Sequence, residues 1–375
     1  MFKLPIERDG KSEHMGPLTG VYLEVLSNRW RDMKFLFIDE ISRVPYKMLY
    51  NIDTRLRQLK NNLDEPFGGI NVIVFGDLMQ LPPVRGLQVF QKPNSQLLSL
   101  HLWRLFGLNE LTQNMRQQGD TSFVDLLNAL RVGKMEAKHF DILISKKLNV
   151  ADLEGYFALL KAIRIYPTNK MVDELNHLVV THYRNQGAQI FKIKAQDELL
   201  DRDPRNNTNM DKLVPKDINK TGSIPHELEI FVGARVMLRY NVLVEGGLVN
   251  GVMGVITQIF WPNYRRDQMY DNDIPDLQIE FDRIGIHRLT PIAGCTVDKA
   301  VIYLGSNLFA DGQAYVALSR LRSLDGLRIE DLDCLKLTGT TPCNEDALDE
   351  MERMRKYPPC SKALIWITNL FLFRF

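Results

Sequence analysis

Two apolar segments with an amphipathic segment between them form the clearest pattern near the start of the chain. Residues 34–38 and 71–75 are mainly apolar, which is typical of parallel strands covered on both faces. Residues 45–63 place apolar side chains at every third or fourth position, the pattern of an amphipathic helix. We therefore predict a right-handed β-α-β unit, in which both strands end at the same edge of a sheet.

The pattern changes twice along the rest of the chain. A helix is expected between residues 117 and 133, and residues 164–170 predict a strand and a turn into a further helix. Residues 186–225 are polar, and short alternating strands with glycine turns follow at 234–240, 252–260 and 277–281. Residues 299–304 and 313–321 return to a buried strand and a helix. The sequence predicts an α/β body with a small inserted β-barrel and a tail at 336–375.

Composition adds few constraints. The 375 residues are 45% hydrophobic and 25% charged, with a net charge of +1, so no global basic field indicates a nucleic-acid partner, although a local basic groove would suffice. The four cysteines form no C-x-x-C pair, which favours reduced thiols in an intracellular protein. Residues 363–375 are very apolar but shorter than the ~20 residues of a spanning helix, which favours a packed terminal segment or a stray reading-frame end over a membrane anchor.

Acidic residues follow both apolar strands. Asp39 and Glu40 follow the first strand and Asp77 follows the second. α/β proteins bind ligands at this edge, and an Asp-Glu pair there can hold Mg²⁺ and accept a proton in nucleotide hydrolysis. Acidic pairs are also common strand caps, so the pair alone is weak evidence. Gln80 strengthens it, because its side chain can reach a terminal phosphate from a loop stiffened by two following prolines.

Two arginines are candidates for a role at the same site. A single arginine is usually solvated or salt-bridged, but a nucleotide-driven motor needs arginines from a second domain to neutralise charge at the γ-phosphate. Arg116 follows Asn114-Met115, and Arg320 lies on the helix expected at 313–321, whose apolar stripe faces the core. By contrast, Gly10-Lys11-Ser12 only imitates a phosphate-binding loop, because Pro5 stands where that loop requires a glycine.

In combination, these segments resemble the motifs of the Pif (petite integration frequency) DNA helicases of superfamily 1B, which include the helicases of Helitron transposons. The resemblance runs from about residue 2 to 327. The matching segments are Phe37-Ile38-Asp39-Glu40-Ile41-Ser42 (motif II), Pro66-Phe67-Gly68-Gly69 with Gly76-Asp77-Leu78-Met79-Gln80-Leu81-Pro82-Pro83-Val84 (motif III), Leu111-Thr112-Gln113-Asn114-Met115-Arg116-Gln117 (motif IV), Leu248-Val249-Asn250-Gly251-Val252-Met253-Gly254 (the turn of an SH3-like barrel) and Gly312-Gln313-Ala314-Tyr315-Val316-Ala317-Leu318-Ser319-Arg320 (motif VI).

The resemblance implies a role for each matched residue. Asp39 would bind Mg²⁺, Glu40 would be the general base and Gln80 would sense the γ-phosphate of ATP. Arg116 and Arg320 would be arginine fingers. Gln313 and Asp77 would belong to the nucleotide-binding residues. The residues implied in DNA binding are Pro82, Pro83, Asn250 and Gly251.

The same resemblance implies a domain plan. We expect two RecA-like parallel-sheet domains: an incomplete first one at 1–107, and a second at 108–185 and 286–335. Residues 186–285 would form the linker and the SH3-like insertion. The implied protein is a monomeric 5′-to-3′ helicase that acts on single-stranded and forked DNA without a membrane partner. It would serve repair, recombination, telomere maintenance or transposon replication, in the nucleus or in the mitochondrion.

Two departures from the family pattern limit this expectation. The Walker A loop of the family lies upstream of the matched region, and motif V keeps only Gly294 and the Thr296-Val297-Asp298-Lys299 part. We therefore expect negligible ATP hydrolysis by this polypeptide alone, as for a truncated gene model or a decayed transposon copy. The alternative is a non-catalytic nucleic-acid-binding or interaction protein built on the remnant of a helicase, which could bind single strands through basic and aromatic residues. The candidates, each of which also fits a solvated surface position, are Lys170, Arg235, Arg239, Tyr240, Arg265 and Arg266.

Overall fold

The computed structural model divides the chain into two compact units. Unit 1 comprises Met1–Pro167 and Lys299–Phe375, and unit 2 is the segment Thr168–Asp298 between them. The structure describes residues 4, 15–91, 93, 101–114, 116–117, 119–149, 151–152, 155, 157–158, 162–194, 227–238, 241–249, 251–261, 274–282, 284–289, 300–338, 343–357 and 370–372. The inserted unit is wider than the expected insertion at 186–285, because helix α6 (Asn169–Asn185) belongs to it.

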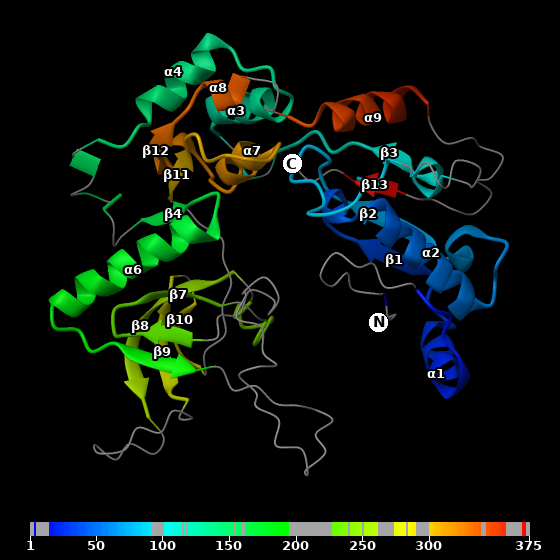
Figure 1. Ribbon diagram of the computed structural model, residues 1–375, viewed down its shortest axis with the longest axis horizontal. Helices are drawn as coiled ribbons and strands as arrows, with labels where there is room; N and C mark the ends of the chain where they lie inside the picture. Colours follow the sequence, from blue (N-terminus) through cyan, green and yellow to red (C-terminus); the bar gives the residue numbers. More distant parts are fainter. Residues whose placement is uncertain are drawn as a thin grey trace. The chain divides into compact units, whose positions relative to one another are not determined.

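The first sheet of unit 1 confirms the predicted β-α-β unit (Figure 1). Strands β1 (Phe35–Ile38) and β2 (Asn71–Phe75) pair in parallel, with Ile38 opposite Val74, and helix α2 (Tyr46–Lys60) connects them. The complete order is β1-β2-β13-β3. Strand β13 (Leu370–Leu372), from the apolar end of the chain, lies parallel between β2 and β3 (Gly107–Asn109).

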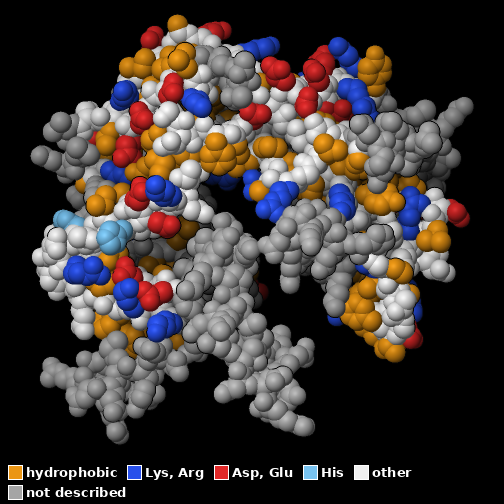
Figure 2. Space-filling model, viewed as in Figure 1, with side chains coloured by type: hydrophobic (Ala, Val, Ile, Leu, Met, Phe, Trp, Pro, Cys, Tyr) orange, Lys and Arg blue, Asp and Glu red, His pale blue; other side chains and the backbone are white. Residues whose placement is uncertain are grey.

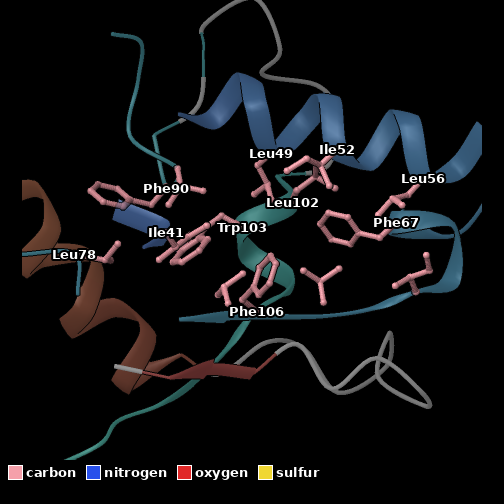
Figure 3. Packing of buried hydrophobic residues seen from close by; sticks show 14 of the residues in the cluster. Ile41, Leu49, Ile52, Leu56, Phe67, Leu78, Phe90, Leu102, Trp103 and Phe106 are labelled. Atoms are coloured by element: carbon pink, nitrogen blue, oxygen red, sulfur yellow. The ribbon is translucent and has the colours of Figure 1, made fainter. Parts of the chain in front are cut away.

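One hydrophobic core lies between this sheet and its helices. Figure 3 shows Leu49, Ile52 and Leu56 pointing from α2 toward a layer that holds Trp103 and Phe106. Further side chains come from α1 (Gly20–Trp30), η2 (Pro66–Gly69), η4 (Leu102–Leu105) and α9 (Glu345–Lys356). The indole N–H of Trp103 donates to the Glu350 carboxylate at 2.9 Å, so α9 is tied to this core by a buried polar contact as well.

The expectation that the first strand is covered on both faces is wrong for the described residues. Phe35 and Phe37 are 53% and 62% exposed, because α2 and the core side chains cover only the opposite face of the sheet. Stacked contacts join Phe35 to Phe37 and Phe37 to Phe75 along the open face.

A second parallel sheet in unit 1 has the order β12-β11-β4. It consists of β4 (Ile163–Ile165), β11 (Ala300–Leu304) and β12 (Leu327–Leu332). Helices α3 (Thr121–Arg131), α4 (Ala137–Ser145), α7 (Gln313–Leu318) and α8 (Leu335–Thr338) accompany it, with short turns η1 (Ile41–Arg43) and η6 (Leu324–Gly326) elsewhere in the unit. Side chains from α3, α7, β11 and β12 share one core. The parallel α/β architecture is thereby confirmed.

Unit 2 is built from antiparallel strands and one long helix. Strands β7 (Arg235–Met237), β8 (Met253–Phe260), β9 (Asp276–Phe281) and β10 (Gly285–Leu289) form a sheet of order β10-β9-β8-β7. Strands β5 (Phe191–Lys194) and β6 (Glu227–Ile230) form a second pair. Residues of both sheets and of α6 share a core. That this unit is an SH3-like barrel stays a prediction.

The surface and the tail add two observations. On the face shown in Figure 2, acidic and basic side chains are interspersed, in keeping with the net charge of +1. Within the described part of the chain, no helix is both long and apolar enough to cross a membrane.

Candidate functional site

The carboxyl edge of the first sheet presents Asp39 and Glu40 directly after β1. Both side chains are exposed, and the Glu40 backbone N–H donates to Asp39 Oδ1 at 3.0 Å. Glu40 adopts the left-handed conformation with φ 51°, which costs about 1–3 kcal/mol for a residue other than glycine. Such backbone strain clusters at functional sites, so the conformation of Glu40 supports the expected importance of this edge.

Gly76 brings the ends of β1 and β2 close together. Its φ is +148°, and a Cβ atom there would lie 2.9 Å from the Ile41 nitrogen. A side chain at this position would therefore separate the Asp39-Glu40 turn from the loop that follows β2. The two strand ends meet at one place, as the β-α-β prediction requires.

The loop after β2 is ordered from within by Asp77. The Asp77 side chain accepts from the Met79 N–H at 3.0 Å, and its carbonyl accepts from the Gln80 N–H at 3.0 Å. Side chain and backbone together fold residues 77–80 into a tight turn. The partly buried Gln80 sits at the end of that turn.

The Asp77 carboxylate is buried and fully engaged. Its side chain is 1% exposed, and Arg131 at the end of α3, 8% exposed, donates to both oxygens at 2.9 Å. The Tyr315 hydroxyl, from α7, donates to Oδ2 at 3.1 Å. With the Met79 N–H this makes four donors, which is the full acceptor capacity of a carboxylate. This geometry speaks against direct contact between Asp77 and a nucleotide, the role expected from the sequence.

The pKa shifts in this cluster favour a charged Arg131 guanidinium and a neutral Tyr315 phenol. Burial, and then the charge of Asp77, raises the pKa of the Tyr315 phenol above its usual range, so the hydroxyl stays a donor. Burial alone would lower the pKa of Arg131, but the Asp77 carboxylate outweighs burial and raises it.

The start of α7 lies against the same loop. Gly312, with φ +72°, would place a Cβ atom 2.5 Å from the Met79 carbonyl oxygen. Only glycine allows this close approach of the helix N-terminus to the Gln80 turn. The next residue, Gln313, donates to the Pro167 carbonyl at 3.3 Å and accepts from the Phe309 N–H at 3.1 Å, so its side chain has partners within unit 1.

The two expected arginine fingers come together at the other end of α7. Arg116 is exposed and donates to the Ser319 carbonyl at 2.9 Å. Ser319 directly precedes Arg320, which is also exposed. The buried Gln117 side chain donates to the Ser319 and Leu321 carbonyls, which fixes the 116–117 segment to this helix end. Arg116 therefore lies beside the backbone that leads into Arg320, and the role of both residues as arginine fingers stays a prediction.

The remaining candidates are less informative. Pro82 and Pro83 are half-buried after the Gln80 turn, and Gly251 has φ +108° in unit 2, whereas Asn250 lies outside the described residues. Gly10-Lys11-Ser12, the motif V segment and the candidates Arg239, Tyr240, Arg265 and Arg266 also lie outside the described residues. Lys170 is paired with Glu174 and Arg235 with Asp282.

A magnesium–nucleotide complex fits the exposed Asp39. The described residues contain no group of three or more His, Cys, Asp or Glu side chains that would hold a metal alone. Mg²⁺ does not need such a cage, because it is usually held by one or two carboxylates together with substrate phosphates and water. An exposed carboxylate at a strand end meets that requirement.

Sequence reasoning missed Arg131 and Tyr315. Tyr315 lies within the motif VI segment, but the sequence assigned it no role there. Arg131 occupies the last turn of α3, where a basic residue is unremarkable. The available signal was an aspartate inside an apolar loop, which must have a cationic or donating partner if it is buried.

Comparison with known proteins gives one consistent result. Residues 2–141 match the family described as PIF1-like helicase, and residues 215–259 match the DNA helicase Pif1, 2B domain. The ATP-dependent DNA helicase PIF1 of Danio rerio is 30% identical over 348 residues, covering 87% of this chain and 50% of the relative. The human protein of that name is 29% identical over 329 residues, covering 81% and 47%. The chain thus spans about half the length of the curated relatives it matches.

Solved structures show the same fold. The crystal structure of Pif1 helicase from Candida albicans has a TM-score of 0.63 at 22% identity, covering 88% of this chain and 78% of that one. A structure of two coordinating Pif1 helicases that concerns unwinding at forked double-stranded DNA has a TM-score of 0.58 at 26% identity, covering 94% and 80%.

Proposed function

Because the chain belongs to the PIF1-like helicase family, we propose that it carries the hydrolysis and coupling elements of an ATP-dependent 5′-to-3′ DNA helicase. Asp39 holds Mg²⁺ with the nucleotide, Glu40 accepts the proton of the attacking water, and Gln80 contacts the γ-phosphate. Arg116 and Arg320 stabilise the charge that develops on the transferred phosphoryl group.

One observation carries this proposal. The Gln80 turn from the first sheet is in contact with the N-terminus of α7, through Gly312 and Met79, and α7 leads to Arg320 with Arg116 beside it. The phosphate-sensing residue and the arginines thus belong to elements that pack directly on one another. The helicase matches, which cover 87% of this chain in the Danio rerio relative, do not favour the alternative of a non-catalytic protein derived from a decayed helicase.

The proposed partner is DNA. The two-helicase structure concerns unwinding at forked double-stranded DNA, and a Pif1 structure from Bacteroides holds single-stranded DNA. We propose single-stranded and forked DNA as substrates of this chain too, with Pro82, Pro83 and Gly251 among the contact residues. We also propose a monomeric unit of action and a nuclear or mitochondrial site of action.

The test uses two proteins: the 375-residue chain and the same chain joined to the upstream part of the Danio rerio relative. ATP hydrolysis is measured with and without single-stranded DNA. We expect near-background rates from the chain alone and DNA-stimulated hydrolysis from the joined protein. Glu40→Gln should lower the stimulated rate about 10²–10⁴-fold, and Arg320→Ala about 10³–10⁵-fold.

Two matched variants serve as controls. Glu352→Gln and Arg29→Ala change exposed helix residues of the same types and should leave the rate within about twofold, as usual for surface positions. The proposal fails if the joined protein hydrolyses ATP equally well with Glu40→Gln, or if DNA does not stimulate it.

A further inference from the structure

We propose that Asp77 is a positioning residue that joins the Gln80 turn, helix α3 and helix α7 into one rigid element, so that the phosphate sensor and the arginine fingers keep a fixed relation. This inference rests on the proposed function. In this proposal Asp77 does not contact the nucleotide. Arg131 and Tyr315 help to link the Gln80 turn to the arginine fingers, a role that the sequence did not indicate.

The hydrogen bonds that the Asp77 carboxylate accepts fill its acceptor capacity. Arg131 occupies both oxygens, and Met79 and Tyr315 take the remaining acceptor positions. A carboxylate with four donors has no capacity left for Mg²⁺ or for a water that bridges to phosphate. Its role must therefore be exerted through the groups that it holds.

Asp77 joins groups that lie far from it in the sequence. Asp77 lies 54 residues from Arg131 and 238 residues from Tyr315 along the chain. The bidentate geometry with Arg131 fixes the orientation of the planar guanidinium as well as its distance. Tyr315 stands two residues after Gln313 and five before Arg320, in the middle of α7. Movement of the turn would therefore be transmitted directly to the helix that leads to Arg320.

The burial of the Asp77–Arg131 ion pair favours a role in specifying one arrangement over a role in stability. Burying two charges gains little stability, because desolvation offsets most of their attraction. Buried pairs of this kind are best justified where one arrangement must be specified over others. The absence of a side chain at Gly312 lets α7 lie close to the Met79 carbonyl, and the Asp77 cluster fixes the orientation of the helix at that close approach.

The experiment measures hydrogen exchange in the full chain, at peptides that cover residues 76–81 and 312–320. Asp77→Asn removes the charge from the turn. We expect the exchange rate to rise about tenfold or more in both peptides. A decrease of about 1.4 kcal/mol in the free energy of local opening raises the exchange rate tenfold. If only the 76–81 peptide changes, the joint does not exist and the proposal is overturned.

Two milder variants guard against simple loss of folding. Tyr315→Phe removes one hydrogen bond and keeps the ion pair, so exchange should rise in both peptides by a smaller factor. Arg131→Lys keeps the charge but lacks the planar fork. Its exchange rates in both peptides should lie between those of the wild type and those of Arg131→Met. Equal exchange in Arg131→Lys and Arg131→Met would show that orientation is irrelevant, against the proposal.

The matched control is another ion pair of unit 1. Arg328 donates to Asp152 at 2.8 Å, with side chains that are 24% and 10% exposed. Asp152→Asn should leave exchange at 312–320 within about twofold of wild type, since the pair ties residue 152 to β12. None of these measurements uses ATP, so their failure is distinguishable from an absence of hydrolysis in the joined protein.

Discussion

The buried pair of Asp77 and Arg131 gives a prediction whose size follows from the structure. The side chains are 1% and 8% exposed and are joined by two charge-assisted hydrogen bonds of 2.9 Å. Arg131→Met would leave the Asp77 carboxylate buried without its counter-charge, which typically costs 3–5 kcal/mol. Asp77→Asn would likewise leave a buried guanidinium facing a neutral amide, at a similar cost.

The double variant separates this effect from packing. With Asp77→Asn and Arg131→Met together, neither charge remains, and the total loss should be smaller than the sum of the single losses by at least about 2 kcal/mol. The free energy of unfolding is obtained from urea denaturation, followed by the fluorescence of Trp103 in a chain whose other three tryptophans are replaced by phenylalanine. Trp103 is fully buried in the first core of unit 1, so in this background the signal reports on that unit.

An additive outcome would refute the reasoning. If the double variant loses the sum of the single losses within about 0.5 kcal/mol, the two residues do not interact energetically. A single-variant loss below about 1 kcal/mol would mean that water reaches the carboxylate, contrary to its burial. Asp53→Asn, which changes the i,i+4 partner of Arg57 on α2, provides a second buried aspartate for comparison.

Three further predictions concern the same unit. Gly312→Ala should lower the free energy of unfolding in urea more than Gly119→Ala. Both glycines have a positive φ, which costs other residues about 1–2 kcal/mol, but of these two only Gly312 would place a Cβ atom 2.5 Å from another atom, the Met79 carbonyl oxygen. Equal losses would contradict the close approach to Met79. Tyr315 has a folded pKa above the usual value of about 10, so the unfolded chain loses that proton first as pH rises. The contribution of Tyr315 is thus complete below pH 10 and falls by up to about 1.4 kcal/mol per pH unit above it, and the wild type should lose more stability than Tyr315→Phe between about pH 9 and 11. Leu56→Ala, at a fully buried position, should cost about 2–5 kcal/mol, whereas Phe37→Ala, on the open face of β1, should cost under about 1 kcal/mol in the same assay.

Local patterns were sufficient to predict the elements of unit 1. The spacing of Leu49, Ile52 and Leu56 predicted α2, and the apolar runs predicted β1 and β2 with their parallel pairing. The spacing of apolar residues is visible within each segment, and general rules of connection fix how consecutive strands pair. Both can therefore be read from a single sequence. The meeting of the Asp39 and Asp77 strand ends followed from the same rules.

Long-range polar contacts were not predictable in this way. No local feature of Arg131 or Tyr315 shows that each one turns toward Asp77, since the partners are separated by 54 and 238 residues. The open face of β1 was missed for a related reason: an apolar strand indicates that burial is favourable, not that a covering element exists. The left-handed Glu40 was missed because glutamate has no intrinsic preference for that conformation.

The division of unit 1 into two stretches has a consequence for synthesis on the ribosome. Strand β4 leaves the exit tunnel early, yet its neighbour in the described sheet, β11, is translated only after the whole of unit 2. Unit 2 is continuous and is free to close by itself while β4 waits with an unpaired edge. The nascent chain therefore carries one unpaired strand of a three-stranded sheet while the whole of unit 2 is synthesised, and chaperone demand during translation should be greatest in that interval.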